Sequence, residues 1–189
     1  MTLVLLLGGA RSGKSALAVE IARQSRRDVV FVATAEVRDD EMRARIGRHR
    51  AERPSDWRTI EAPTDIDAAL AAAAPAACLI LDCLSLWLAN LLEAGQAGGE
   101  IEELVQATAL TAGARPGLTI AVSNEVGLGV VPATPLGRRY RDLMGRVNAI
   151  WAGAADEALL VVAGRVLPLA QTGGLVAAGV MGTGDDDHE

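Results

Sequence analysis

The residues best suited to chemistry stand near the start of the chain, in the sequence GGARSGKS at positions 8–15. Gly8 and Gly13 would let the backbone wrap around phosphate oxygens, Lys14 would reach the terminal phosphates, and Ser15 could place its hydroxyl on Mg²⁺. The motif follows the apolar run LVLLL and precedes the helical pattern SALAVEIARQ, whose N-terminal dipole also favours an anion. This context predicts a P-loop that binds a nucleoside triphosphate; a tight glycine turn that only caps a helix is the alternative.

An acidic residue at the end of a second apolar segment could complete this site. CLILD, at residues 78–82, is a hydrophobic strand pattern that ends in Asp82. This is the Walker B pattern, in which a carboxylate beside the P-loop binds Mg²⁺ directly or through water. An aspartate that only caps the next helix is the alternative. Another expected strand, VVFVA, leads into residues 33–35, and ligands bind at the carboxyl ends of strands in open α/β sheets, so we expect these residues beside the P-loop.

Arginines gather in the segment that follows, although the protein as a whole is acidic, with a formal net charge of -6. Asp39 or Asp40 is expected to cap a helix that ends near residue 52, before Pro54. One face of this helix carries Met42, Ile46 and His49. The basic residues of the segment are Arg45, Arg48, Arg50 and Arg53. Spacing alone favours a solvated helix face over an anion site, and a packed or surface histidine over a catalytic one.

A scaffold must bring these distant segments together, and the chain has the length and pattern for it. With 189 residues and 50% hydrophobic content, it fits one domain with a substantial core, which we assign to residues 1–170. Alternating strand and helix patterns predict an α/β P-loop (RecA-like) fold with a mostly parallel central sheet. The expected strands cover residues 3–7, 29–33, 57–62, 78–82, 118–123 and two segments within 157–169. The expected helices cover residues 14–26, 40–52, 64–74, 84–92, 100–112 and 138–155.

Several other segments are interpreted more simply. The stretch AGQAGG near residues 94–99 is expected to be a flexible loop. Residues 124–137 follow a strand and contain several glycines and prolines, so they form either a substrate loop or a plain connection. The last long helix is expected to bury Leu143, Val147, Ile150 and Ala154. Residues 171–189, rich in glycine and acidic at the end, are expected to form a flexible tail.

Composition restricts the class of protein. The acidic charge and an aromatic content of 3% argue against a nucleic-acid surface, which normally needs a basic face or stacking rings. No apolar run approaches the length of a membrane span, which favours a soluble cytoplasmic protein. Cys78 and Cys83 lack metal-ligand spacing and are expected to be buried free thiols.

Five segments together resemble one known family. They are GGARSGKS, VATAEVRDDEMRARIGRHRAERPSDWRTIEAP, LDCLSLWLANLL, SNEVGLGVVP and GRVNAIWAGAADE. They are similar to the bifunctional adenosylcobinamide kinase/adenosylcobinamide-phosphate guanylyltransferase, and the resemblance extends to about residue 168. The pattern H-x-x-x-R-P-x-x-W-x-T-x-E, which runs from His49 to Glu61, is not a general P-loop feature. The resemblance implies that adenosylcobinamide is phosphorylated by ATP or GTP, and that GMP from GTP is then transferred to the adenosylcobinamide phosphate.

The resemblance also implies roles for particular residues. In this family a histidine carries GMP as a phosphoramidate, and the motif places that role on His49, which reverses the preference stated above. Glu61 would accept hydrogen bonds from guanine. Ser15 and Asp82 would hold Mg²⁺. The implied nucleotide contacts are Gly8, Gly9, Ala10, Arg11, Ser12, Gly13, Lys14, Ser15, Ala33, Thr34, Ala35, Arg50, Ala51, Glu52, Arg53, Glu61 and Asp82.

Two features depart from the family pattern or extend it. Arg48 stands where some relatives carry a second histidine, and the only other histidine, His188, lies in the acidic tail. The family is homotrimeric, and the apolar helix around Trp87 is either a subunit interface or part of the core.

Two other classes of function are alternatives. One is a P-loop ATPase that couples hydrolysis to conformational change, with Glu125 polarising water, and the other is a nucleotide-sensing module.

Overall fold

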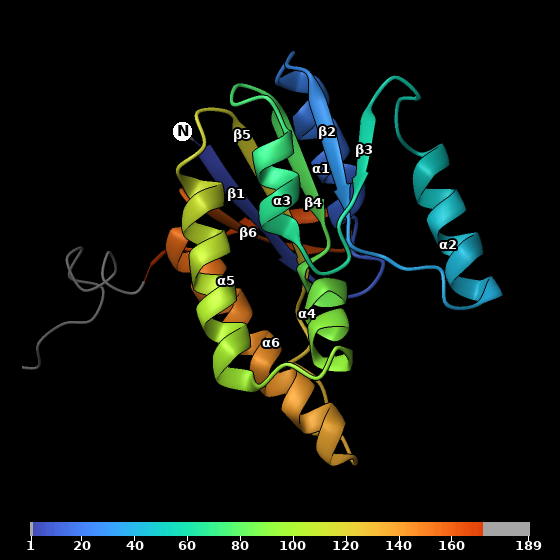
Figure 1. Ribbon diagram of the computed structural model, residues 1–189, viewed down its shortest axis with the longest axis vertical. Helices are drawn as coiled ribbons and strands as arrows, with labels where there is room; N and C mark the ends of the chain where they lie inside the picture. The colour runs from blue at the N-terminus through green and yellow to red at the C-terminus, as the bar shows by residue number, and fades with distance from the viewer. Residues whose placement is uncertain (1, 172–189) are drawn as a thin grey trace, which may run out of the picture.

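A mostly parallel sheet forms the centre of the molecule, as the alternation of strand and helix patterns predicts (Figure 1). The computed structural model describes residues 2–171, and the expected tail lies outside them beyond Gln171. The seven strands run in the order β3-β2-β4-β5-β1-β6-β7, and only β7 is antiparallel to its neighbour. The strands are β1 (Thr2–Gly8), β2 (Val29–Ala33), β3 (Arg58–Glu61), β4 (Cys78–Asp82), β5 (Leu118–Asn124), β6 (Glu157–Val162) and β7 (Arg165–Pro168). The predicted α/β fold is therefore confirmed.

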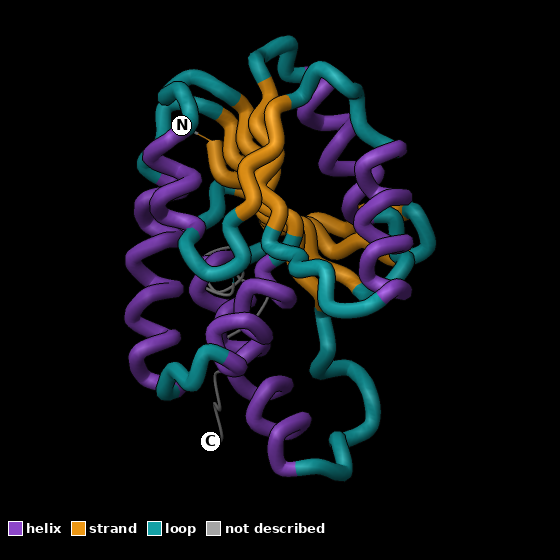
Figure 2. Tube along the Cα trace, turned by 45° about the vertical axis from the view of Figure 1, so that its right-hand side comes forward, coloured by secondary structure: helices purple, strands orange, loops and turns teal. Residues whose placement is uncertain are grey.

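Helices cover both faces of this sheet (Figure 2). The helices within residues 2–171 are α1 (Lys14–Gln24), α2 (Asp40–Ala51), α3 (Ile66–Ala72), α4 (Leu84–Glu93), α5 (Gly98–Gly113) and α6 (Pro135–Ala154). The side chains of β1 alternate between two apolar clusters: Leu3 and Leu5 pack with α3 to α6, whereas Val4 and Leu6 pack with α1. Because both faces are covered, the central strands are continuous apolar runs rather than alternating patterns.

The structure corrects three expectations about the helices. Gly98 and Gly99 form the first turn of α5 rather than a loop. Helix α6 begins earlier than expected, because Thr134 caps it through the amide of Gly137. Its buried stripe includes Trp151, which is fully buried, whereas Ile150 and Ala154 are only partly buried. The buried stripe consists of Leu143, Met144, Val147, Asn148 and Trp151, which the helical period of 3.6 residues places on one face.

The apolar helix α4 belongs to the core. Trp87 is 0% exposed, and its indole nitrogen donates to the carbonyl oxygen of Thr64 at 2.8 Å. Trp87 is therefore part of the core of the chain rather than of a subunit interface. Cys78 and Cys83 are buried free thiols, as predicted. Within residues 2–171, no helix is both long and apolar enough to cross a membrane.

Helix α2 differs from the other helices because it does not cover the sheet. Figure 1 shows it at the outer side of β3. None of its residues is buried, although Met42, Ile46 and His49 are partly buried and share one face, as predicted. Asp39 is the cap, and its side chain accepts a hydrogen bond from the amide of Met42. Apolar burial contributes little to holding this helix in place.

Candidate active site

Strand register brings the chemically active segments to one edge of the sheet. In β1 and β5, Gly8 lies opposite Asn124. On the other side of β5, Asp82 of β4 lies opposite Val122, and Ala33 of β2 lies opposite both Asp82 and Glu61. All these residues stand at the carboxyl ends of parallel strands, where open α/β sheets bind ligands. Ala33, Glu61 and Asp82, which are separated by up to 49 positions in the sequence, are thus neighbours.

Backbone geometry at the P-loop explains its glycines. Gly8 has φ +153°, and a Cβ atom there would lie 2.2 Å from the carbonyl oxygen of Val161 on β6. Gly13, at the start of α1, has φ +105°, in the left-handed region that favours glycine. The turn therefore packs closely against β6 and delivers the first amides of α1 to the cleft.

Lys14 is held inside the curve of this loop. Its Nζ donates to the carbonyl oxygens of Gly8 and Gly9, both at 2.8 Å, and the residue is only 6% exposed. Burial lowers the pKa of this ammonium, whereas the nearby Cys83 and Asp82 raise it. The loop thus holds a buried cation in the cleft, where the sequence predicts that terminal phosphates bind.

Asp82 lies across from Lys14, at the end of β4. Burial raises the pKa of its carboxyl group, and a hydrogen bond from Ser15 and electrostatic interactions with His49, Lys14 and Arg53 oppose that rise. Ser15 and Asp82, the pair predicted to hold a metal, thus lie near each other in the same cleft. Their hydroxyl and carboxylate oxygens are the hard ligands that Mg²⁺ prefers.

Thr34 has a structural position rather than a place on the cleft wall. Its side chain is fully buried, and its hydroxyl donates to the carbonyl oxygen of Cys83 at 2.8 Å while accepting from the amide of Cys83 at 2.7 Å. This exchange ties the end of β2 to the residue that follows Asp82. Ala33 and Ala35, on either side of Thr34, line the cleft.

His49 lies near the C-terminal end of α2, on the wall that faces the P-loop. Its Nδ1 is 3.6 Å from Oε2 of Glu52. Its backbone carbonyl accepts a hydrogen bond from Nε of Arg53 at 3.0 Å, and the Arg53 guanidinium lies 3.6 Å from the centroid of the Phe31 ring. This stacking is a cation–π contact that connects the end of α2 to β2. Desolvation lowers the pKa of Arg53, and Asp82 opposes the shift.

Glu61 faces the same wall from the end of β3. One of its carboxylate oxygens accepts from Nη2 of Arg50 at 2.9 Å. Both side chains are exposed, at 72% and 55%, so this pair adds little to stability. Its effect is to keep a carboxylate at the rim, within reach of a ligand.

These side chains line one cleft of about 1130 Å³, at the upper end of the volumes of small-molecule sites. Most of the predicted nucleotide contacts line it, and so does His49. Four do not: Gly8, Gly9, Thr34 and Ala51. All four predicted arginines line it, namely Arg45, Arg48, Arg50 and Arg53. The solvated-face and anion-site interpretations are therefore compatible, because this basic surface is open to water and also faces the P-loop.

Sequence reasoning missed several residues of the cleft wall. Phe31 lies within a buried strand pattern, Leu86 within an apolar helix, and Arg38 within an unpatterned connection, and all three line the cleft. Asn124 ends β5 and lines it too. For Asn124 the sequence does contain a signal, because it ends an apolar strand pattern as Asp82 does. Polar residues at the ends of parallel strands gather at one edge of the sheet.

Comparison with known proteins gives consistent results. The sequence profile of the family described as cobinamide kinase / cobinamide phosphate guanyltransferase matches residues 4–169. The bifunctional adenosylcobalamin biosynthesis protein CobP of Pseudomonas aeruginosa is 46% identical over 169 residues, covering 87% of this chain and 95% of the relative. The CobU protein of Salmonella typhimurium, with the same description, is 38% identical over 177 residues, covering 86% and 96%.

A solved structure extends the comparison to the fold. An ATPase from the type III secretion system of pathogenic bacteria superimposes with a TM-score of 0.57 over 94% of this chain and 61% of the ATPase, at 14% sequence identity. At that identity the match supports the P-loop fold and nothing about activity. The profile match and the curated relatives carry the assignment: this chain belongs to the cobinamide kinase / cobinamide phosphate guanyltransferase family.

Proposed function

We propose that this enzyme phosphorylates the aminopropanol hydroxyl of adenosylcobinamide with ATP or GTP, and then transfers GMP from GTP through His49 to the adenosylcobinamide phosphate. The observation that carries the proposal is that His49, Lys14 and Asp82 line one cleft. A kinase alone would need only the P-loop side of this cleft. The basic wall with a histidine among its arginines is what a nucleotidyl-transfer step would add.

In the kinase step, the P-loop would position the triphosphate and the hydroxyl oxygen would attack the γ-phosphorus. The bond between that phosphorus and the β–γ bridging oxygen breaks, and the nucleoside diphosphate leaves. Lys14 and the first amides of α1 would neutralise charge on the phosphate oxygens. The proton of the hydroxyl must also be accepted, and Asp82, a cleft carboxylate that interacts with Ser15 and Lys14, could accept it.

The proposal includes a bound Mg²⁺, and the residues of the cleft fit this ion. Within residues 2–171, no cluster of three or more His, Cys, Asp or Glu side chains could hold a metal ion. Magnesium at nucleotide sites is typically bound by one or two protein oxygens together with substrate phosphates and water. Ser15 and Asp82 supply such a pair, and the ion would neutralise phosphate charge when bound.

In the second step, a ring nitrogen of His49 would attack the α-phosphorus of GTP. A P–N bond forms, the bond to the bridging oxygen breaks, and pyrophosphate leaves. A phosphate oxygen of adenosylcobinamide phosphate then attacks the same phosphorus, the P–N bond breaks, and adenosylcobinamide-GDP is released. Because Nδ1 faces Glu52, Nε2 is the nitrogen available for attack. The arginines of α2 would neutralise the α-phosphate and the leaving pyrophosphate.

The intact mass of protein incubated with GTP and Mg²⁺ tests the proposal most directly. We expect a covalent adduct of one GMP per chain, which disappears when adenosylcobinamide phosphate is added. Protein incubated with ATP alone serves as the control and should stay unmodified if guanine is selected. Unmodified protein that nevertheless hydrolyses GTP would instead support an ATPase-like or sensing role.

Glu61 is the residue we propose for guanine recognition. A carboxylate accepts hydrogen bonds from the ring N–H and the exocyclic amine of guanine, which adenine does not offer in that arrangement. We expect Glu61→Gln to weaken GTP binding about tenfold and ATP binding less than about twofold, because one acceptor becomes a donor. Titration of both nucleotides measures the difference.

Glu41→Gln is the matched control for this experiment. Glu41 lines the same cleft from the other end of α2, so its replacement removes an equal charge without touching β3. It should affect both nucleotides equally and weakly. If Glu61→Gln also weakens GTP and ATP to the same extent, Glu61 has no part in base recognition.

The two other classes of function have weaker support. Glu125, which would polarise water in an ATPase, does not line the cleft, and one of its carboxylate oxygens accepts from the amide of Gly127. A sensing module would not need the arginines and histidine of α2. We also propose that the enzyme acts in the cytoplasm as a homotrimer and binds no nucleic acid, as the resemblance and the acidic composition suggest.

A further inference from the structure

Helix α2 carries His49 but is held by polar contacts rather than by a core. None of its residues is buried. At its C-terminal end, Arg53 bonds to the carbonyl of His49 and stacks on Phe31. At its N-terminal end, the connection from β2 must fix where the helix begins. Within that connection, Arg38 stands one residue before the cap Asp39 and makes contacts to a distant helix.

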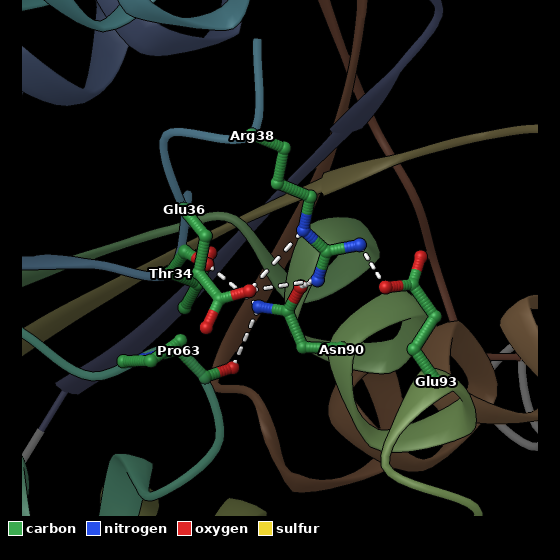
Figure 3. Close-up of polar contacts among 6 residues, drawn as sticks. All are labelled: Thr34, Glu36, Arg38, Pro63, Asn90 and Glu93. Carbon is green, nitrogen blue, oxygen red and sulfur yellow. Dashed lines mark hydrogen bonds and ion pairs between the residues drawn. The ribbon is translucent and has the colours of Figure 1, made fainter.

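The fixed point of this arrangement is Asn90 on α4. The residue is only 6% exposed, and its amide nitrogen donates to the carbonyl oxygens of Thr34 and Pro63, both at 2.8 Å (Figure 3). Thr34 and Pro63 follow β2 and β3, so one side chain joins α4 to the ends of two strands. Its remaining acceptor, Oδ1, receives a hydrogen bond from Nη2 of Arg38 at 2.8 Å. A buried amide with these partners has one orientation, because a flipped amide would place donors against donors.

Two carboxylates hold the guanidinium of Arg38 on Asn90. Glu36 accepts from Nε at 3.2 Å and from Nη2 at 2.8 Å, and Glu93 of α4 pairs with Nη1 on the far side (Figure 3). Isolated exposed pairs contribute little. Here the planar fork of arginine is fixed on three sides, and one partner is a buried residue, so its direction is defined.

We propose that Arg38 and Asn90 are positioning residues for guanylyl transfer: they fix the start of α2 against α4, so that the imidazole of His49 points at the α-phosphorus of the bound nucleotide. This proposal rests on the proposed function. Without the anchor, α2 could turn about its contact with Phe31, which would change the direction of the imidazole. His49 lies nine residues after Asp40, or about 13.5 Å along the helix, so a tilt of about 10° moves one end relative to the other by about 2 Å.

Comparing the two reactions distinguishes a positioning role of Arg38 from a general loss of activity. Phosphoryl transfer uses Lys14, Ser15 and Asp82, which belong to α1 and β4, so a displaced α2 should leave it nearly unchanged. Guanylyl transfer needs His49 in line with the breaking bond, and a misplacement of about 1 Å can cost about 10²-fold in rate. Because the Phe31 contact still holds the other end, we expect a smaller loss, of about tenfold.

Arg38 also lines the cleft, so it could instead bind the nucleotide directly. Glu93 distinguishes the two roles, because it contacts Arg38 but does not line the cleft. If Arg38 acts through α2, Glu93→Gln should slow guanylyl transfer in the same direction, by about two- to threefold, and add little to Arg38→Ala in the double variant. If Arg38 binds nucleotide, its removal raises the KM for the nucleotide in both reactions and Glu93→Gln has no effect.

The experiment measures single-turnover GMP incorporation against GTP concentration, and adenosylcobinamide phosphorylation with ATP in parallel. We expect Arg38→Ala to lower the maximal incorporation rate about tenfold with little change in the half-saturating GTP concentration, and kinase activity to fall less than about twofold. Arg38→Lys, which keeps the charge but not the fork, should fall between Arg38→Ala and wild type. Arg43→Ala is the control, because Arg43 pairs with Asp40 within α2 and does not line the cleft.

Several outcomes would overturn the proposal. They are an equal loss in both reactions, a change only in the half-saturating GTP concentration, and normal guanylyl transfer in both Arg38→Ala and Glu93→Gln. Should Arg38→Ala fold poorly, the surface variants Glu93→Gln and Arg38→Lys still decide the question. A wild-type protein that incorporates no GMP would contradict the proposed function itself, which is a separate and recognisable result.

Discussion

Lys14→Ala is expected to lower the rate of adenosylcobinamide phosphorylation by about 10²–10³-fold, the usual cost of losing one group that stabilises charge in the transition state. Lys14 is the only lysine of the chain, and it lies buried inside the P-loop curve. No other ammonium can substitute for it. The measurement is the initial rate with ATP, together with the affinity for the triphosphate, which should also fall.

Arg11→Ala is the matched control for this variant. Arg11 belongs to the same loop but is exposed, so its removal takes one positive charge from the cleft without emptying the P-loop curve. Its effect should stay below about tenfold, because screened surface charges contribute little. If Lys14→Ala phosphorylates at the wild-type rate while it is folded, this loop is not the phosphate site.

His49→Ala is expected to abolish GMP incorporation and to lower formation of adenosylcobinamide-GDP by on the order of 10⁴-fold or more, because the covalent route loses its nucleophile. Phosphorylation depends on the P-loop and Asp82, so it should persist, and adenosylcobinamide phosphate should accumulate. Incorporation from α-labelled GTP and chromatography of the corrinoid products measure the two effects separately.

Mapping the adduct guards against a different nucleophile. A phosphoramidate is labile to acid and stable to mild alkali whether it forms on histidine or lysine, so lability alone does not separate His49 from Lys14. Cleavage at glutamates would place a His49 adduct in the peptide of residues 42–52 and a Lys14 adduct in an earlier one. His188→Ala, which removes the only other histidine, should still be labelled. A labelled His49→Ala protein would eliminate His49 as the nucleophile.

Much of the fold could be predicted because its signals are local. The apolar run before Gly8, the glycine spacing of the loop and the apolar pattern before Asp82 each need only a few neighbouring residues. Helix boundaries were less accurate where capping decided them, as at Thr134, whose hydroxyl begins α6 before the apolar pattern does. The glycine-rich stretch predicts a loop at Gly98 and Gly99, but α5 begins at Gly98, where the carboxylate of Glu100 accepts a hydrogen bond from the amide of Ala97.

Less of the candidate site than of the fold could be predicted from local patterns. Family resemblance, rather than spacing, pointed to His49 and Glu61, and the structure places both on the cleft wall. Thr34 was expected at the nucleotide, yet its hydroxyl is turned away to Cys83. Its direction depends on the neighbouring strand, which lies 49 residues further along the chain. No local pattern contains that information.

The sequence by itself determined the P-loop, the strand that ends in Asp82 and the alternation that makes an α/β sheet, because backbone periodicity and motif spacing act over a few residues. Only the tertiary structure decided the strand order, which sets Gly8, Ala33, Glu61 and Asp82 along one edge. It also decided that an exposed helix with no buried residue faces the P-loop and is fastened to α4 through Arg38 and Asn90. Such contacts join residues far apart in the chain, and their geometry follows from how the whole sheet and its helices pack.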